Sequence, residues 1–220
     1  WCSPWRKPVP NIPGYKILAI LGHGGMGVVY KAIELDSGRR VAIKVVRFES
    51  TVNEEQTVRL HREFQIAQKV HHPNLVRVIN RVLDLEGNVC IVMGLLKGAT
   101  LNSQYIPSSQ SMCLQMMRQI GKGLAYLHSR QLLHRDVKLS NIFRTNAGRF
   151  VLLDFGLALD SNATRLTRTD ELIGTFGYLA PEQLRSDEIG PYTDIYQLGV
   201  AAFYLLTGKA PFTNEEILLN

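Results

Sequence analysis

Cysteine is scarce in this sequence, with three residues in a chain of 220. Cys2, Cys90 and Cys113 are an odd number, and no two of them have C-x-x-C spacing. These two features argue against a disulfide framework and against a structural zinc site. The sequence therefore favours a chain that resides in a reducing, cytosolic compartment.

Long apolar runs are missing as well. The longest strongly apolar stretch, residues 198–206, is far shorter than the roughly 20 residues that a membrane-spanning helix requires. We expect no membrane segment in this stretch of chain and a cytoplasmic location, which includes the cytosolic part of a longer, membrane-tethered protein. Residues 1–14 begin with a proline-rich stretch and are predicted to be an N-terminal extension or linker.

Clusters of a single charge are also absent. The formal net charge is +6, but the basic residues are dispersed and form no polybasic run. Nucleic-acid binding is therefore not expected, although the net charge would suit a phosphate-rich ligand. With 45% hydrophobic residues, the chain can bury a sizeable core, in one two-lobed domain or in two small ones.

The sequence does contain a dense group of polar residues around two short motifs. Residues 134–141 read HRDVKLSN, and the motif DFG follows at 154–156. This span holds two carboxylates (Asp136 and Asp154), the amide of Asn141 and two cations. Phosphoryl transfer from a nucleotide uses that set: a carboxylate to orient and deprotonate the attacking hydroxyl, oxygen ligands for Mg²⁺, and cations to offset phosphate charge.

Apolar residues precede both motifs. Leu132-Leu133 and residues 150–153 are predicted to be short buried strands, each of which releases polar residues at its end. This arrangement would place Asp136, Asn141 and Asp154 at one edge of a cleft. Either motif alone could be an ordinary turn, but the two together in this order favour a catalytic site.

The N-terminal part predicts three antiparallel strands. Residues 15–21 and 28–34 are rich in β-forming residues, and a third strand covers residues 40–46. The connection GHGGMG at 22–27 has the G-x-G-x-x-G pattern, but a strand follows it, whereas a dinucleotide-binding fold needs a helix there. A Walker-type loop is excluded because no Gly-Lys-Ser/Thr follows. Glycines in such a loop let the backbone approach a phosphate closely.

The third strand carries a lysine with an expected partner. The twofold alternation of a strand sends Ala42 and Lys44 to the same face. A helix is predicted from a capping box at 53–56 through residue 70, and Glu63 lies beside its apolar stripe. A Glu on the inner face of a helix is costly unless it is paired, so we expect an ion pair between Glu63 and Lys44.

The remaining elements complete two parts. Strands at 75–84 and 88–93 would make the sheet five-stranded, and residues 93–96 would connect it to the C-terminal part of the chain. A helix at 111–129 is predicted to be a core helix. Its expected apolar positions are Leu114, Met117, Ile120, Leu124 and Leu127. A second apolar helix, 193–207, would be central, with Asp194 holding the backbone of the 134–141 segment.

Taken together, the glycine-rich loop, VAIK at 41–44, HRDVKLSN, DFG and the APE at 180–182 resemble the signature of eukaryotic-type serine/threonine protein kinases, particularly of bacterial members. The resemblance implies an α+β, two-lobed fold, with a small five-stranded antiparallel β lobe that carries one helix and a larger, mainly helical lobe. It assigns residues 15–94 to the N-lobe and 95–220 to the C-lobe, which we expect to be truncated after its central helix.

The same resemblance implies roles for individual residues. Asp136 would be the catalytic base, with Lys138 near the γ-phosphate, and Lys44, paired with Glu63, would hold the α- and β-phosphates of ATP. Mg²⁺ or Mn²⁺ would be bound by Asn141 and Asp154. The residues matched to nucleotide-binding positions are Leu21, Gly22, Gly24, Gly27, Val29, Ala42, Lys44, Met93, Leu95 and Phe143.

The segment between DFG and APE predicts regulation. Thr167 and Thr169, and after them Thr164, are candidate phosphorylation sites in a polar stretch with little apolar content. A phosphate there would add roughly −1.5 to −2 charge, and Arg135 could receive it. The alternative is a polar loop with incidental threonines. Thr175 matches a position that hydrogen-bonds the catalytic Asp and Lys, so we expect it to be structural first.

The predicted function is transfer of the ATP γ-phosphoryl group to Ser and Thr hydroxyls of proteins. Expected partners are protein substrates and a second copy of the chain for trans-autophosphorylation. One alternative is a catalytically impaired, pseudokinase-like scaffold or fragment, which would be expected to have lost Lys44, Asp136 or Asp154. The other is a small-molecule phosphotransferase, which would have little use for the segment that ends in APE.

Overall fold

The computed structural model describes residues 9–24, 27–46, 64–101, 108–153, 176–185 and 187–212. The chain divides into two compact units. The first comprises residues 1–61 and 77–96, and the second comprises residues 62–76 and 97–220. The predicted boundaries of the two lobes, 15–94 and 95–220, stay a prediction.

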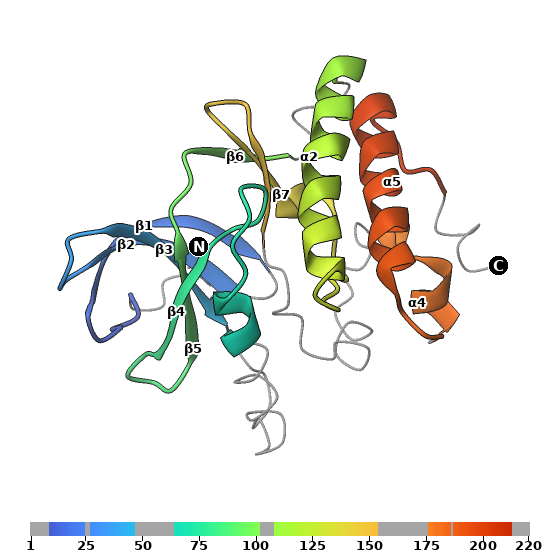
Figure 1. Cartoon of the computed structure of the whole chain (residues 1–220). Coiled ribbons are helices and arrows are strands. Elements are labelled where there is room, and N and C mark those ends of the chain that lie inside the picture. Colours follow the sequence, from blue (N-terminus) through green and yellow to red (C-terminus); the bar gives the residue numbers. More distant parts are fainter. Residues whose placement is uncertain are drawn as a thin grey trace, which may run out of the picture. The chain divides into compact units, whose positions relative to one another are not determined.

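The first unit is built on a five-stranded antiparallel sheet, as predicted (Figure 1). The order of the strands is β1-β2-β3-β5-β4, so the N-terminal meander lies beside the β4–β5 hairpin. The strands are β1 (Tyr15–Gly24), β2 (Gly27–Glu34), β3 (Arg40–Val46), β4 (Val78–Leu83) and β5 (Val89–Gly94). Strand β1 reaches three residues further than predicted, because Gly24 pairs with Gly27.

One face of this sheet forms the core of the first unit. Val41, Ile43 and Val45 alternate along β3 and pack with apolar residues of the neighbouring strands. Their partners in this cluster are Ile12, Val28, Tyr30, Ala32, Cys90 and Val92. Because side chains alternate along a strand, Ala42 and Lys44 lie on the opposite face of β3. The prediction that these two residues share a face therefore agrees with the structure.

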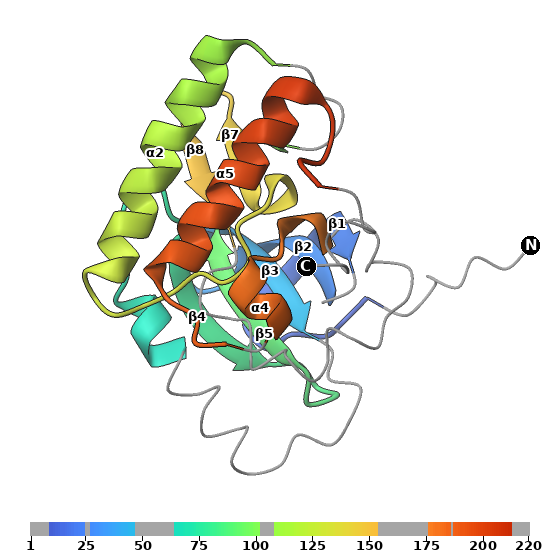
Figure 2. The same ribbon diagram turned by 90° about the vertical axis from the view of Figure 1, so that its right-hand side faces the viewer.

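The second unit contains two long helices that pack side by side, α2 (Gln110–His128) and α5 (Pro191–Thr207), as both views show (Figures 1 and 2). A three-stranded sheet, β6-β7-β8, was not predicted as a unit. Its strands are β6 (Gly98–Thr100), β7 (Ile142–Thr145) and β8 (Phe150–Leu152), and the short helices are η2 (Leu139–Asn141), η4 (Phe176–Tyr178) and α4 (Pro181–Arg185). Residues 64–68 are also helical.

Helix α2 lies within one residue of its predicted bounds, but its buried face was partly wrong. Leu114 and Met117 are 66% and 37% exposed, and Cys113 and Met116 are buried in their place. The buried positions 113, 116, 120, 124 and 127 repeat every three or four residues. In the predicted stripe the first two positions were shifted by one residue, which rotates a side chain about 100° around the helix.

Two further predictions about strands need correction. Leu132 and Leu133 do not form a strand: residues 132–138 have no regular secondary structure. The Leu132 N–H donates to the Leu127 carbonyl of α2, and the N–H groups of His134, Arg135 and Val137 donate to side chains of α5 rather than to a neighbouring strand. The strand predicted from residue 75 begins at Val78, and Leu75 forms instead an isolated parallel bridge with Leu152.

Both cysteines in the described part of the chain are buried and free, which agrees with the absence of a disulfide framework there. Burial raises the pKa of the Cys90 thiol to about 12 and also raises the pKa of Cys113. At neutral pH these side chains therefore remain thiols and serve as small apolar groups. Among the helices of the described residues, none is both long and apolar enough to cross a bilayer.

Candidate active site

The backbone of residues 134–141, the HRD loop, is held by a buried carboxylate from α5. The Asp194 side chain is fully buried; its Oδ2 accepts from the His134 N–H at 2.9 Å and its Oδ1 from the Arg135 N–H at 2.7 Å. The Nε2 atom of His128, at the end of α2, lies 2.7 Å from Oδ2. Asp194 thus ties α2, α5 and the HRD loop together, as its predicted role requires.

The HRD loop brings three of the predicted site residues into contact. Lys138 Nζ lies 3.2 Å from Asp136 Oδ2, and the same oxygen accepts from Asn141 Nδ2 at 3.0 Å. Asn141 Nδ2 also donates to the backbone carbonyl of Asp136 at 2.8 Å. These bonds fix the rotamer of Asp136, a residue that is only 8% exposed. An aspartate held in this way, next to a lysine, suits a base that must orient a hydroxyl group.

The Asn141 side chain has one defined orientation, and its predicted role as a metal ligand stays a prediction. Since both of its hydrogen bonds to Asp136 use Nδ2, the amide oxygen Oδ1 points away from Asp136. Amide and carboxylate oxygens are the ligands that Mg²⁺ prefers, and it usually takes only one or two from the protein. This donor type fits a magnesium ion. Within the described residues, no group of three or more His, Cys, Asp and Glu side chains forms a metal cage.

The end of β8 is bonded to the HRD loop. Leu153 N donates to the carbonyl of Asn141 at 2.8 Å, and the Leu153 carbonyl lies 2.7 Å from His134 Nε2. The His134 side chain is fully buried, and its Nδ1 accepts from the Asp136 N–H at 3.2 Å. This agrees with the prediction that His134 is a packed structural residue. The residue that precedes the DFG motif in the sequence, Leu153, is therefore bonded to this loop, while the motif itself lies outside the described residues.

The glycines of the glycine-rich loop, residues 22–27, differ in whether the backbone requires a glycine. Gly27 has φ +138°, and a Cβ there would lie 2.0 Å from the carbonyl oxygen of Val45. The hairpin alone therefore demands a glycine at this position. Gly22 has no such requirement, since a Cβ there would meet no atom within 4 Å. Its contribution to a phosphate site stays a prediction, as does that of Gly24.

The other predicted nucleotide-binding residues are distributed over both units. On the sheet of the first unit, Val29 pairs with Lys44 and Ala42 pairs with Met93 in the strand register. Lys44, Ala42 and Met93 are buried, whereas Leu21 is 50% exposed. Leu95 in the first unit and Phe143 in the second are half-buried. The predictions for Glu63, Asp154, Thr164, Thr167, Thr169 and Thr175 fall outside the described residues.

The segment that ends in APE packs on α5. The rings of Tyr178 and Tyr204 are stacked, with 5.8 Å between their centroids. Burial raises the pKa of Tyr178 to about 12, although a hydrogen bond with the Leu139 backbone acts in the opposite direction. The phenol therefore stays neutral over the physiological pH range. Next to it, the Thr193 hydroxyl donates to Glu182 Oε1 and accepts from the Gly190 N–H.

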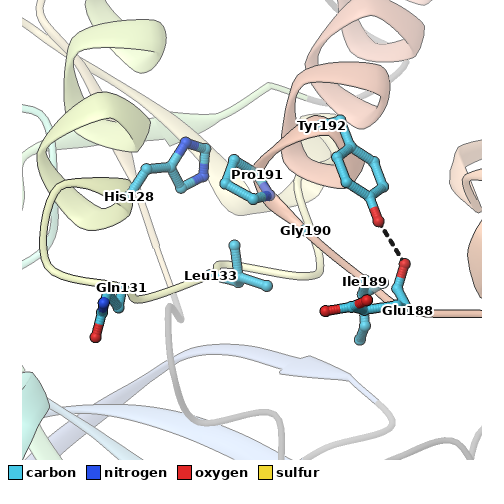
Figure 3. A pocket seen from close by; sticks show the side chains of 8 residues that line it. All are labelled: His128, Gln131, Leu133, Glu188, Ile189, Gly190, Pro191 and Tyr192. Atoms are coloured by element: carbon cyan, nitrogen blue, oxygen red, sulfur yellow. Dashed lines mark hydrogen bonds between the residues drawn. The ribbon is translucent and has the colours of Figure 1, made fainter.

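A pocket of about 430 Å³ lies on the second unit (Figure 3). Its wall includes a hydrogen bond from the Tyr192 hydroxyl to the Glu188 carbonyl at 2.6 Å. It is lined by His128, Gln131, Leu133, Glu188, Ile189, Gly190, Pro191 and Tyr192. None of the predicted site residues contributes to its lining.

Sequence reasoning missed two functional candidates, Gln183 and Gln197. Gln197 is 1% exposed, and its Oε1 accepts from the Val137 N–H at 2.8 Å, next to Asp136. One signal could have found it. Asp194 and Gln197 are polar residues three positions apart in a mostly apolar helix, so they share a face that must meet polar partners.

Comparison with known proteins agrees with this geometry. The model of the protein kinase domain family matches residues 15–219, so the chain belongs to the protein kinase family. It is 38% identical over 206 residues to the serine/threonine-protein kinase PrkC of Bacillus subtilis, which covers 91% of this chain and 31% of that protein. It is 34% identical over 211 residues to PknA of Mycobacterium tuberculosis, covering 93% of this chain and 49% of that protein.

Among solved structures, the PknI kinase domain of M. tuberculosis matches with a TM-score of 0.74 and 27% identity, over 92% of this chain and 76% of that chain. The resemblance to bacterial serine/threonine kinases and the α+β kinase-like fold are thereby confirmed. The chain spans less than half the length of PrkC and of PknA. Members of the family generally use ATP and a divalent metal ion.

Proposed function

We propose that this chain is the catalytic domain of a protein serine/threonine kinase, which transfers the γ-phosphoryl group of ATP to Ser and Thr hydroxyls of proteins. The observation that carries the proposal is the contact of Asp136 with both Lys138 and Asn141 on one buried loop. A lysine and an asparagine are thus held within hydrogen-bonding distance of one carboxylate oxygen, and phosphoryl transfer uses all three residue types.

In this mechanism Asp136 orients the substrate hydroxyl and accepts its proton as the oxygen attacks the γ-phosphorus. The two donors on Oδ2 keep the carboxylate in one rotamer, so its position is set before the substrate arrives. Lys138 brings a positive charge beside the attacking oxygen and the phosphoryl group. Most of the catalytic effect then comes from positioning and from electrostatic stabilisation.

The predicted binding set would hold the nucleotide. Lys44, paired with Glu63, would bind the α- and β-phosphates. The adenine would be bordered by Val29, Ala42, Met93 and their neighbours in the predicted nucleotide-binding set. Asn141 and Asp154 would hold Mg²⁺ or Mn²⁺, and the metal when bound neutralises charge on the phosphates. The orientation of the Asn141 amide oxygen, away from Asp136, supports this assignment.

Regulation by phosphorylation of Thr167 or Thr169 is part of the proposal. Arg135, next to Asp136, would receive the phosphate. The Nε atom of Arg135 is buried and has no hydrogen-bond partner in the described part of the chain, which supports such a role. A second copy of the chain would phosphorylate these threonines, and the other partners would be protein substrates. The scarcity of cysteine supports a cytosolic setting.

Label transfer from ATP that carries ³²P in its γ-phosphate, in the presence of Mg²⁺, tests the function. We expect the wild-type protein to label a serine- and threonine-rich test protein, and Asp154→Ala to reduce the rate by about 100-fold or more, because a metal ligand is lost. Equal labelling by the two proteins would remove the proposed mechanism. No labelling by either one would favour the scaffold alternative.

The two glycines of the loop make a matched pair of tests. Gly27→Ala is expected to destabilise the folded protein by about 1–3 kcal/mol, because its φ and the Val45 carbonyl exclude a Cβ. Gly22→Ala is expected to leave the melting temperature unchanged and to raise the KM for ATP several-fold. Melting curves and ATP titrations measure both effects. A Gly22→Ala protein with an unchanged KM would show that this residue does not approach the phosphates.

A further inference from the structure

Two side-chain amides meet on the peptide that precedes the proposed catalytic base. The carbonyl oxygen of Arg135 accepts from Gln197 Nε2 at 3.2 Å and from Gln183 Nε2 at 3.3 Å. Gln197 belongs to α5 and Gln183 to α4. Because this carbonyl is part of the peptide bond that joins Arg135 to Asp136, its orientation helps to set where the Asp136 side chain begins.

The two amides have only one consistent orientation. Gln197 Oε1 accepts from the Val137 N–H at 2.8 Å, while its Nε2 donates to Arg135 and also to Gln183 Oε1 at 2.8 Å. Gln183 Oε1 accepts in addition from the Ala180 N–H at 3.0 Å. Flipping Gln197 would set its NH₂ group against the Val137 N–H and its oxygen against a carbonyl. The hydrogen-bond network therefore holds the peptide groups on both sides of Asp136 in one orientation.

The loop needs this support because its backbone is strained. Arg135 has φ +67°, which is uncommon for a residue with a side chain. Relaxing φ to a negative value would rotate the peptide between Arg135 and Asp136. Asp194 holds the N–H of Arg135 and the amides hold its carbonyl, so two side chains of α5 and one of α4 keep this conformation.

We propose that Gln197 and Gln183 are positioning residues for the phosphoryl-transfer step. This inference rests on the proposed role of Asp136 as the base. The amide pair fixes the peptide bond before Asp136 and the N–H of Val137 after it. The Asp136 carboxylate is thereby held in position to accept a hydrogen bond from the substrate hydroxyl. It also links α4, at the end of the segment that closes with APE, directly to the catalytic loop.

Three substitutions remove the hydrogen bonds of Gln197 and Gln183 in different combinations. Gln197→Met removes all three bonds of that side chain. Gln197→Glu keeps an oxygen for the Val137 N–H but cannot donate to Arg135 or to Gln183. Gln183→Met removes the second bond to Arg135 together with the bonds at Ala180 and Gln197. If donation to the Arg135 carbonyl matters, the glutamate variant is as impaired as the methionine variant.

A matched control is available on α2. Gln119 is a half-buried glutamine, like Gln183, and its Oε1 accepts a backbone N–H, that of Phe150 at 2.8 Å, and also accepts from Asn74. Both of these partners lie outside residues 134–141. Gln119→Met therefore measures the loss of stability that follows from removing a structural amide of the same kind.

The test measures kcat, the KM for ATP, the melting temperature and hydrogen exchange of the Val137 amide in the intact protein. For both Gln197 variants we expect kcat to fall about 10- to 100-fold with a KM for ATP within about twofold of wild type, as for a displaced catalytic group. We expect a smaller loss for Gln183→Met and non-additive losses in the double variant, because both amides act on one carbonyl. Gln119→Met should lower the melting temperature but keep kcat.

Two outcomes would overturn the inference. One is a kcat for the Gln197 variants no lower than that of Gln119→Met at an equal loss of melting temperature. The other is unchanged protection of the Val137 amide in Gln197→Met, since its hydrogen bond would then not depend on this side chain. Failure of the proposed function itself is distinguished by Asp136→Asn: if that variant transfers label as fast as wild type, Asp136 is not the base, whatever the glutamines do.

Discussion

Replacing Asp194 by alanine is expected to lower the free energy of unfolding by about 3–5 kcal/mol, the loss typical of breaking a buried charged interaction. The carboxylate is fully buried and accepts from two backbone N–H groups, with the His128 imidazole as its third partner. The alanine variant leaves the N–H groups of His134 and Arg135 buried and unpaired, each at a cost of about 1–3 kcal/mol. Urea denaturation followed by circular dichroism measures this change.

A control for Asp194→Ala lies in the preceding loop. Asp187 is exposed, and Asp187→Ala is expected to change stability by no more than about 0.5 kcal/mol, as is usual at the surface. The HRD loop of Asp194→Ala should also lose hydrogen-exchange protection at His134 and Arg135, while the β1–β5 sheet keeps its own. Equal urea midpoints for the two variants would mean that the buried carboxylate does not hold the loop.

Replacing Asp136 by asparagine is expected to lower kcat by about 10²- to 10⁴-fold, the range that general-base catalysis contributes. Asparagine has nearly the same shape and keeps a side-chain oxygen that can accept from Lys138 and Asn141, so the melting temperature and the KM for ATP should change little. Steady-state kinetics at several ATP concentrations separate these quantities.

The Asp136→Glu variant tests whether the position of the carboxylate matters as well as its presence. It keeps a carboxylate but moves it by one methylene group, and a displacement of about 1 Å can cost about 100-fold in rate. Both variants should therefore be slow, for different reasons. If Asp136→Asn kept a kcat within tenfold of wild type while its fold was intact, the base would have to be another group.

The sequence predicted the sheet and the two long helices well, because their apolar spacing is local information. The alternation of Val41, Ile43 and Val45 predicts a strand with one buried face, and the structure has it. Asp136, Lys138 and Asn141 lie together because only a few residues of chain separate them, whereas the predicted convergence of Asp136 and Asn141 with Asp154 stays a prediction.

The features that were predicted wrongly depend on tertiary contacts that a single sequence does not reveal. Leu132 and Leu133 have a strand-like composition, yet Asp194 and Gln197 take up the backbone N–H groups of the loop after them. Leu114 and Met117 fit an amphipathic helix as well as Cys113 and Met116 do, and the elements that pack on α2, α5 and β8, decide between them. The contact of Cys113 Sγ with the Ala202 carbonyl at 3.7 Å shows which face α5 covers.

The chemical identity of the labelled product decides whether this chain transfers the γ-phosphoryl group of ATP to serine and threonine. A test protein is incubated with the wild-type chain, Mg²⁺ and ATP labelled with ³²P at either the γ or the α position, and then hydrolysed in acid. We expect label as phosphoserine and phosphothreonine from γ-labelled ATP alone. Label from the α position, label on other residues, or no label on protein would contradict it.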